Sequence, residues 1–451
     1  MMLQNWNLLI VLFTQGLCVL ADVSVNGGRI RVPLKRAASN TASTSNLSRR
    51  GPIAPLFNDR GSQYLAEIEI GTPSQKFTVA VDTGSADFWI PDHECPVLQC
   101  PLDRFDGRRS KTFESLNQSF SITYGIGSAR GHFAIDQVRF GGLTADKQQF
   151  GLATATERIL STKRQGRSHD PQINGIFGLA FPRLTASDKS KGYTPFMFNL
   201  LKNHALKRPV FSIFLNSVDK AGWAGELLLG DIDPSKYEGD LAYLSVAQST
   251  LFGESDYYYW SIYGQAVAVL EGVESPYVPF VKPLDIILDT GSTLTYMPAQ
   301  LVSVVIDAVL GKGRYKYDDS TSLYYVDCGA RVSDRATLEL HFSANDSFSS
   351  APYKMRVSAK DLVLPYDGST IEKANTCIFG IAPIGVQTDR FIVGDSMLRS
   401  TYLVFDMQER RIGLAPARTD QRSGSSHSSN ACAYSTKWTL YALIPIILMF
   451  L

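Results

Sequence analysis

Two tetrapeptides in this chain contain the residue types of a carboxylate site. Asp82 and Asp289 each begin the sequence Asp-Thr-Gly-Ser, each follows an apolar run, and the two lie 207 positions apart (289 minus 82). One such tetrapeptide is ordinary turn chemistry, because Asp, Gly and Ser all favour turns. Two copies with matching flanks indicate instead an internal repeat in which each copy supplies one Asp.

The repeat extends beyond the tetrapeptides. Residues 79–91 align with residues 286–298 at the same offset, and both segments end in proline. Further along, Ile176-Phe-Gly follows the first Asp and Ile392-Val-Gly follows the second at a similar distance. We therefore expect two lobes of one design, each with one carboxylate at the end of a strand.

Two carboxyl groups held side by side can carry out acid–base catalysis on a water molecule. Both cannot ionise cheaply, so the pair holds one proton over an acidic pH range. The ionised carboxylate takes a proton from water while the protonated one donates to the scissile carbonyl. This chemistry predicts hydrolysis at acidic pH with Asp82 and Asp289 as the acid–base pair. It needs no cofactor, no metal ion and no covalent intermediate.

The other residues of both tetrapeptides have predicted roles in the same site. Glycine lets the backbone approach a carboxylate closely, and the serine hydroxyl can donate to a carboxylate oxygen. The threonine can hydrogen-bond across the boundary between the lobes. The supporting residues predicted in this way are Thr83, Gly84, Ser85, Thr290, Gly291 and Ser292.

From Gln63 to Ala417 the chain resembles the pepsin-like aspartic proteases. The resemblance rests on the two tetrapeptides, the later apolar-apolar-Gly triplets, and a C-terminal segment, Phe391–Asp406 followed by Arg411–Pro416, that is similar nearly position by position. It implies an all-β, bilobal fold with the active-site cleft between two similar lobes. It also implies endopeptidase activity on polypeptide substrates and a threonine pair that locks the two loops together.

The segment Tyr124-Gly-Ile-Gly resembles the flap hairpin that closes over substrate in that family. Gly125 and Gly127 are expected to form a mobile tip, and the Tyr124 hydroxyl can bond the indole N–H of Trp89. Between the glycines, Ile126 offers a lysine ammonium no partner, and an unpaired buried charge is costly. The flap therefore predicts a preference for Leu, Phe or Met over Lys before the scissile bond.

Short strands are expected to position these residues. Apolar and polar residues alternate from Tyr64 to Ile70, which predicts a half-buried strand, and Lys76 to Val81 predicts the next. Similar segments between Gly-, Pro- and Asn-rich turns continue to about Pro416. One amphipathic helix is predicted from Pro298 to Leu310.

Both ends of the chain have the composition of targeting segments. An apolar run from Leu8 to Leu20 precedes the small residue Ala21, which predicts a cleaved signal peptide, with a buried core helix as the alternative. A Ser-rich stretch, a polar spacer and the apolar run Trp438–Leu451 predict a glycolipid (GPI) anchor signal. A tail-anchored helix is the alternative, although the run is shorter than the roughly 20 residues of a bilayer span.

Residues 22–50 combine Ser, Thr and Asn with interspersed basic residues. The dibasic pairs Lys35-Arg36 and Arg49-Arg50 predict a prosegment removed by a processing protease, with a disordered leader as the alternative. Its basic residues, Arg31 among them, could lie against the two carboxylates before removal. The predicted organisation is a signal peptide at 1–21, a prosegment at 22–50, an N-terminal lobe at 51–235, a C-terminal lobe at 236–418, and a Ser-rich linker with anchor signal at 419–451.

The cysteines agree with a secretory route. Four lie in the expected mature chain and allow three pairings. Cys95 and Cys100 are close enough to close a small loop, which leaves Cys328 with Cys377. A zinc site is not favoured, because no Cys-x-x-Cys pair or His partner accompanies them. Glycan acceptor motifs begin at Asn117 and Asn345.

Charge and composition restrict the remaining alternatives. A formal net charge of +1 argues against a nucleic-acid partner. The short prosegment, its dibasic pairs and the C-terminal anchor signal together resemble the fungal yapsin-like branch of the family. This resemblance implies a monomeric enzyme that is attached to the plasma membrane or cell wall, or is released outside the cell. The first alternative is a catalytically inactive pepsin-like binding protein, which usually lacks an Asp or its Gly. An adhesive surface protein would show tandem repeats, and a glycosidase would not need duplicated loops.

Overall fold

The computed structural model describes residues 25–26, 29–36, 63–125, 127–160, 173–187, 192–216, 223–251, 253–368, 370–384 and 391–418. The predicted signal peptide and the predicted linker with its anchor signal lie outside the described residues, as does most of the predicted prosegment. Among the described residues, no helix has both the length and the apolar character needed to cross a bilayer.

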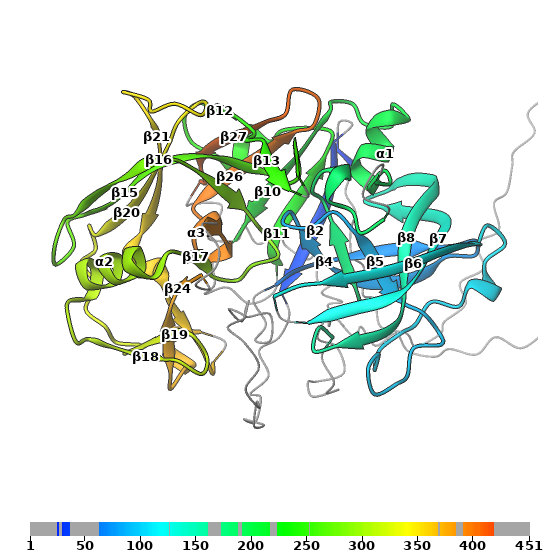
Figure 1. Ribbon diagram of the computed structural model, residues 1–451, viewed down its shortest axis with the longest axis horizontal. Helices are drawn as coiled ribbons and strands as arrows, with labels where there is room; N and C mark the ends of the chain where they lie inside the picture. The colour runs from blue at the N-terminus through cyan, green and yellow to red at the C-terminus, as the bar shows by residue number, and fades with distance from the viewer. Residues whose placement is uncertain are drawn as a thin grey trace, which may run out of the picture.

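The chain folds mainly into β-sheets, as expected. In Figure 1 the first half of the described chain lies mostly on one side and the second half mostly on the other. The largest sheet has 14 strands and contains strands from both halves. In spatial order these are β12 (Ala242–Ser245), β27 (Arg411–Pro416), β26 (Thr401–Asp406), β10 (Val210–Leu215), β11 (Trp223–Leu229), β2 (Arg29–Arg36), β3 (Tyr64–Ile70), β4 (Gln75–Asp82), β9 (Ile176–Gly178), β5 (Phe88–Pro91), β8 (Leu143–Glu157), β7 (Ser128–Phe140) and β6 (Glu114–Thr123), with β1 (Val25–Asn26) paired to β2.

The second half of the chain adds smaller sheets. A seven-stranded sheet has the order β21 (Tyr353–Ser358), β20 (Thr337–Phe342), β15 (Ser261–Leu270), β16 (Tyr277–Leu288), β25 (Phe391–Val393), β17 (Thr295–Met297) and β24 (Ile381–Pro383). A four-stranded sheet contains β18 (Tyr315–Asp318), β19 (Leu323–Val326), β23 (Cys377–Phe379) and β22 (Val363–Pro365), and a hairpin pairs β13 (Ser249–Leu251) with β14 (Glu254–Asp256).

Helices among the described residues are few and short. The α-helices are α1 (Phe196–Lys202), α2 (Ala299–Leu310) and α3 (Asp395–Leu398). The 3₁₀-helices are η1 (Gly107–Arg109), η2 (Pro182–Leu184), η3 (Pro234–Lys236), η4 (Ala359–Leu362) and η5 (Ile371–Lys373). The predicted amphipathic helix is α2, which buries its apolar face, including Val305 and Ile306, while Val304 stays partly exposed.

The same strand arrangement occurs twice, as the internal repeat predicts. In the N-terminal lobe β9 lies between β4 and β5, parallel to β4 with Asp82 opposite Gly178. In the C-terminal lobe β25 lies between β16 and β17, parallel to β16 with Leu288 opposite Val393. The apolar residues of each apolar-apolar-Gly triplet thus lie in a short strand beside the strand that leads to an Asp. The triplets are apolar because β9 is buried along its length and β25 is buried except for the partly exposed Ile392.

A segment of the predicted prosegment is a strand of the large sheet. Strand β2 pairs antiparallel with β11 along most of its length and with β3 at its end. Basic and apolar residues alternate along it, so that Val32 and Leu34 are buried. Arg31 donates to Glu226 Oε1 (2.7 Å) and forms an ion pair with Asp233. The expectation that Arg31 lies against the two tetrapeptide carboxylates was therefore wrong.

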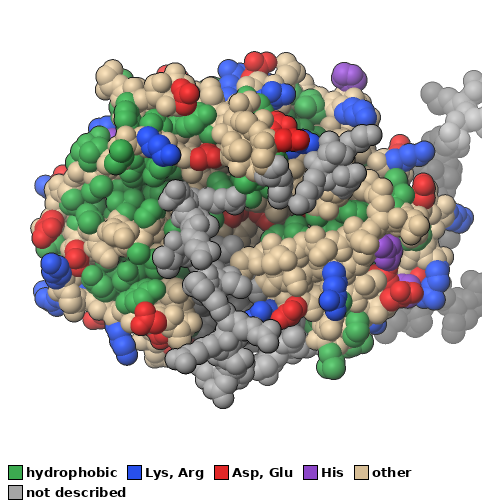
Figure 2. Space-filling model, in the orientation of Figure 1, with side chains coloured by type: hydrophobic (Ala, Val, Ile, Leu, Met, Phe, Trp, Pro, Cys, Tyr) green, Lys and Arg blue, Asp and Glu red, His purple; other side chains and the backbone are tan. Residues whose placement is uncertain are grey.

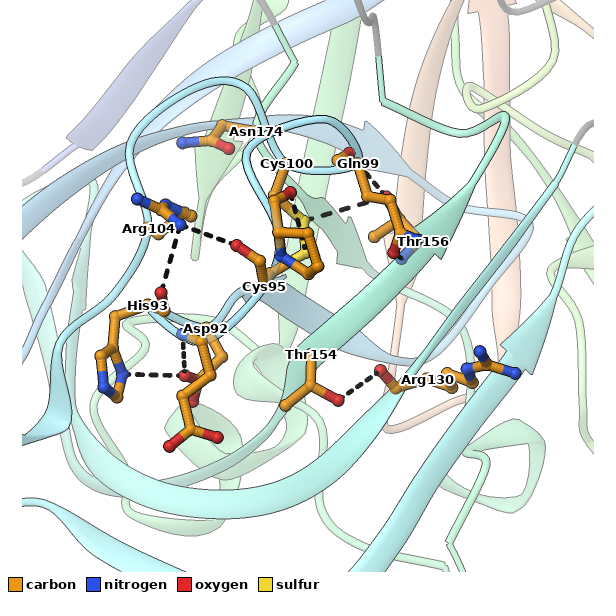
Figure 3. Close-up of a disulfide and its surroundings, with 12 residues drawn as sticks. Asp92, His93, Cys95, Gln99, Cys100, Arg104, Arg130, Thr154, Thr156 and Asn174 are labelled. Carbon is orange, nitrogen blue, oxygen red and sulfur yellow. Dashed lines mark hydrogen bonds and ion pairs between the residues drawn. A yellow bond between two sulfur atoms is a disulfide. The ribbon is translucent and has the colours of Figure 1, made fainter.

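Both expected disulfides are present, Cys95–Cys100 and Cys328–Cys377. Figure 3 shows how the small loop closed by the first is attached to its lobe. The Arg104 guanidinium donates to the backbone carbonyl of Cys95 (2.7 Å), and the Thr156 hydroxyl donates to that of Gln99 (2.8 Å). The disulfide therefore closes a loop that is also fastened to the end of β8.

Candidate active site

The two aspartates of the repeat meet where the lobes join. Asp82 is the last residue of β4, and Asp289 directly follows β16. Their exposed fractions are only 6% and 8%, and each carboxyl group lies directly against the glycine of the other loop. Figure 2 shows the surface hollowed between the two halves of the molecule, with acidic side chains deep in the hollow.

Each carboxylate is held by an amide and a hydroxyl of its own loop. The Gly84 N–H donates to Asp82 Oδ1 (2.8 Å), and the Ser85 hydroxyl donates to Asp82 Oδ2. The second loop repeats both bonds. The Gly291 N–H donates to Asp289 Oδ1 (2.8 Å), and the Ser292 hydroxyl donates to Asp289 Oδ2 (2.6 Å). These bonds fix the plane of each carboxyl group.

The glycine of each loop faces the carboxylate of the other lobe. A side-chain carbon at Gly84 would overlap the carboxyl group of Asp289, and one at Gly291 would overlap that of Asp82. No other residue type has room at either position. The glycines are therefore required for the two carboxyl groups to meet.

The threonines connect the two loops directly. The Thr83 hydroxyl donates to Leu288 O (2.7 Å), and the Thr290 hydroxyl donates to Val81 O (2.8 Å). Each hydroxyl also accepts the backbone N–H of the other threonine, at 3.0 and 3.2 Å. All four bonds cross between the lobes, so they limit how far the two carboxyl groups can separate.

The environment of the pair favours retention of a proton. Burial raises the pKa of Asp82, and the neighbouring charge of Asp289 raises it further. The hydrogen bonds from Ser85 and Gly84 act in the opposite direction, because they stabilise the ionised form. The pair therefore keeps a shared proton to a higher pH than an isolated carboxyl group.

Tyr124 lies beside this pair, as the flap resemblance implies. Its hydroxyl accepts the indole N–H of Trp89 (2.9 Å) and interacts with Ser85. Burial raises the pKa of Tyr124 well above its usual value, so the hydroxyl stays neutral. The site thus extends from the Asp82 loop through Ser85 to the flap.

The glycines beside Tyr124 shape the turn. The Tyr124 N–H donates to Gly127 O (2.8 Å). A side-chain carbon at Gly127 would overlap the backbone at Glu157, so the flap base packs closely on the end of β8. Gly125 is described at the turn, and Ile126 lies outside the described residues.

One buried acid near the site was missed in the sequence. Asp87 is fully buried, accepts the Ala186 N–H (2.8 Å) and lies near Tyr193, whose hydroxyl accepts the Phe88 N–H (3.1 Å). The only signal was an acidic residue between the apolar Ala86 and Phe88. Burial raises the pKa of Asp87 to about 7, against the effect of its hydrogen bonds.

The remaining predicted positions lie away from the carboxyl pair. Asn117 and Asn345 are exposed, as a glycan acceptor must be. No group of three or more metal-binding side chains occurs in the described ranges.

A bilobal β fold with a buried pair of carboxyl groups where its lobes meet defines the class of aspartic proteases. The model of the eukaryotic aspartyl protease family matches residues 63–417. Mucorpepsin of Rhizomucor miehei is 31% identical over 358 residues, which is 78% of each chain. Cathepsin E of Mus musculus is 31% identical over 370 residues (80% of this chain, 82% of the relative), and the vacuolar aspartic protease of Candida albicans 31% over 367 residues (81% and 78%).

This chain belongs to the eukaryotic aspartyl protease family and is an aspartic-type endopeptidase.

Proposed function

We propose that this endopeptidase cleaves polypeptides at acidic pH with Asp82 and Asp289 as its catalytic residues, and that it acts at the cell surface. The observation that carries the catalytic assignment is the meeting of two buried carboxyl groups, each against the glycine of the other loop and each held by an amide and a hydroxyl of its own loop.

The geometry supports the following reaction. With one proton on the pair, the ionised carboxylate takes a proton from a water molecule as its oxygen attacks the scissile carbonyl carbon. The other carboxyl group gives its proton to the carbonyl oxygen. The tetrahedral intermediate then collapses: the carboxyl group that is now protonated gives its proton to the leaving amine, and the ionised carboxylate takes the proton of one hydroxyl, so that the pair again holds one proton. The raised pKa of Asp82 keeps the required proton in place under acidic conditions.

Tyr124 and the flap are proposed to close the cleft over substrate. The Trp89–Tyr124 hydrogen bond fixes the tyrosine hydroxyl near Ser85. Covering the carboxyl pair excludes water and strengthens the electrostatic interactions within the site. Thr83 and Thr290 hold the two loops in register during the reaction.

The location follows from segments outside the described residues and from the disulfides. Two disulfides are expected in a protein that folds in an oxidising compartment. A signal peptide at 1–21, glycans at Asn117 and Asn345, and a GPI signal within 419–451 would direct the enzyme to the plasma membrane or cell wall. We place it in the fungal yapsin-like branch on the same features.

Maturation is proposed to occur at Arg49-Arg50. The other dibasic pair, Lys35-Arg36, ends strand β2, where Lys35 pairs with Trp223 and with Leu65. Backbone bonded within a sheet is a poor protease substrate, because cleavage needs local unfolding. Residues 22–50 are accordingly a prosegment that is released as one piece by a processing protease.

The catalytic assignment is tested with the secreted enzyme and two conservative variants. Asp82→Asn and Asp289→Asn should each lower kcat by about 10² or more, the usual size of an acid–base contribution. Wild type is incubated with a peptide library from pH 3 to 7, with and without pepstatin, to measure class, specificity and pH range together. A folded, matured variant that keeps more than roughly a hundredth of the wild-type rate would remove that Asp from the mechanism.

A further inference from the structure

Trp260 lies between the lobes, immediately before β15, and is fully buried. Its ring packs against three phenylalanines from different parts of the chain. Ring centroids lie at 4.3 Å from Phe181, 5.1 Å from Phe405 and 5.7 Å from Phe211. A side chain enclosed in this way has one accessible position, because protein interiors are close-packed.

The indole N–H of Trp260 reaches the loop of Asp82. It donates to Leu179 O (2.9 Å), a bond buried from solvent. Leu179 follows β9, and its own N–H donates to the backbone carbonyl of Asp82 (2.8 Å). A single residue therefore connects the indole to the main chain of Asp82.

The backbone of Trp260 reaches the other loop. Its carbonyl accepts the N–H of Leu288 (2.9 Å), and Leu288 directly precedes Asp289. Leu288 O in turn accepts the Thr83 hydroxyl (2.7 Å). Trp260 is thus bonded, through its side chain on one side and its main chain on the other, to the neighbours of both aspartates.

We infer that Trp260 is a positioning residue that holds the two catalytic carboxyl groups at their working separation. This inference rests on the proposed assignment of Asp82 and Asp289. Trp260 touches neither substrate nor the reacting atoms, and acts through Leu179 and Leu288. Without the indole N–H, the buried Leu179 carbonyl loses its donor, and the residue that bonds the Asp82 main chain loses its hydrogen bond to the C-terminal lobe.

The threonine pair and Trp260 have different effects on the site. The threonines bond the tips of the two loops to each other, whereas Trp260 connects the residues behind them. The splitting between the two proton affinities of the pair grows as the carboxyl groups approach. If the two carboxyl groups move apart, the two apparent pKa values of the pair should therefore lie closer together. The bell-shaped plot of kcat against pH should then become narrower on both its acidic and its basic side.

The test removes the N–H without removing the ring. Benzothienylalanine at position 260 has nearly the shape of tryptophan but carries sulfur in place of the indole N–H. The full chain is produced and matured as for wild type, and kcat, KM and the pH dependence of kcat are measured. We expect kcat to fall about tenfold with KM changed less than about twofold, the pattern of an interaction needed only for the chemical step. The pH profile should narrow.

Trp260→Phe, which also lacks the donor, is the second variant. Phe211→Leu is the matched control, because it removes a ring that packs on Trp260 but has no part in the connection between the loops. We expect Trp260→Phe to reproduce the lower kcat and the narrower profile. The control should lower thermal stability and leave the width of the profile unchanged.

The outcomes separate this inference from the assignment beneath it. If the benzothienylalanine variant has the wild-type kcat and the wild-type width of the kcat–pH profile, the proposed role of Trp260 is refuted. Inactive Asp82→Asn and Asp289→Asn variants would still support the catalytic assignment in that case. Equal narrowing in Phe211→Leu also refutes the proposed role of Trp260, because loss of packing alone would then explain the effect. Active aspartate variants would instead refute the proposed function.

Discussion

Replacing Asp87 by asparagine should stabilise the protein at neutral pH but not at acidic pH. The Asp87 carboxyl group is fully buried, and among the described residues no cation forms an ion pair with it. Burial raises its pKa from 3.8 to about 7, and the hydrogen bond from Ala186 and the nearby Tyr193 hydroxyl offset only part of this effect. The folded protein therefore holds a neutral acid where the unfolded chain would hold a carboxylate.

The sign and size of the effect follow from proton linkage. Between pH 3.8 and about 7, unfolding releases the Asp87 proton, so the free energy of unfolding falls as pH rises through this window. Each tenfold change in proton affinity is worth about 1.4 kcal/mol, so the full loss above pH 7 is roughly 4 kcal/mol. Asparagine has no proton to release and avoids this loss. Its altered hydrogen bonding costs about 1 kcal/mol at every pH.

The assay is the free energy of unfolding in urea, measured at several pH values from about 4 to 7.5. Asp87→Asn should be slightly less stable than wild type at the acidic end and more stable, by roughly 2–3 kcal/mol, at the neutral end. Asp319→Asn is the control, because it makes the same substitution at an exposed position. Parallel stability curves for Asp87→Asn and wild type would refute the argument that burial raises the pKa of Asp87.

Three further predictions concern pH, location and specificity. Activity should be highest at acidic pH and should fall as the pH rises through the upper pKa of the pair, since the shared-proton state disappears once both carboxyl groups ionise; full activity well above the Asp82 pKa of about 8 contradicts the mechanism. Truncation after Ser423 should release soluble, active enzyme into the medium, because the removed segment is expected to be a targeting signal and no part of the fold. A truncated enzyme that stays bound to the membrane would contradict the proposed lipid anchor. Paired peptides with Leu or Lys before the scissile bond should differ in kcat/KM in favour of Leu. The difference should correspond to about 1–3 kcal/mol, the free energy of burying an aliphatic side chain. In the Ile126→Asp variant the kcat/KM ratio should shift towards the Lys peptide. A wild-type preference for Lys would refute the specificity argument.

Much of the fold was predictable because burial imposes local periodicity. The alternating segment from Tyr64 to Ile70 is strand β3 with the same bounds, and the predicted helix at 298–310 differs from α2 by one residue. The triplets that supply β9 and β25 were identified through the repeat, but their strand conformation was not predicted, because three residues carry too little pattern alone. The disulfides followed from spacing, since a short separation leaves one pairing for the remaining cysteines.

The features that were missed depend on contacts between distant parts of the chain. Arg31 meets Glu226 across 195 positions, and Trp260 meets Leu179 across 81. Asp87 meets Ala186 across 99. No local pattern specifies such pairs, because the partners become neighbours only when the sheets assemble. An acidic residue in an apolar segment, or a tryptophan after three tyrosines, shows only that the position is unusual.

The repeat also conceals a difference between the two halves of the site. Behind the first loop, the Leu179 N–H donates to Asp82 O, and its carbonyl accepts from Trp260. Behind the second, the residue after the glycine of the triplet is Asp395, whose N–H donates to Ser292 O (2.8 Å). The mechanism needs one protonated and one ionised carboxyl group, and two identical tetrapeptides do not choose between them. The choice must come from these unequal surroundings, which is why changes behind the loops should alter proton sharing without touching either aspartate.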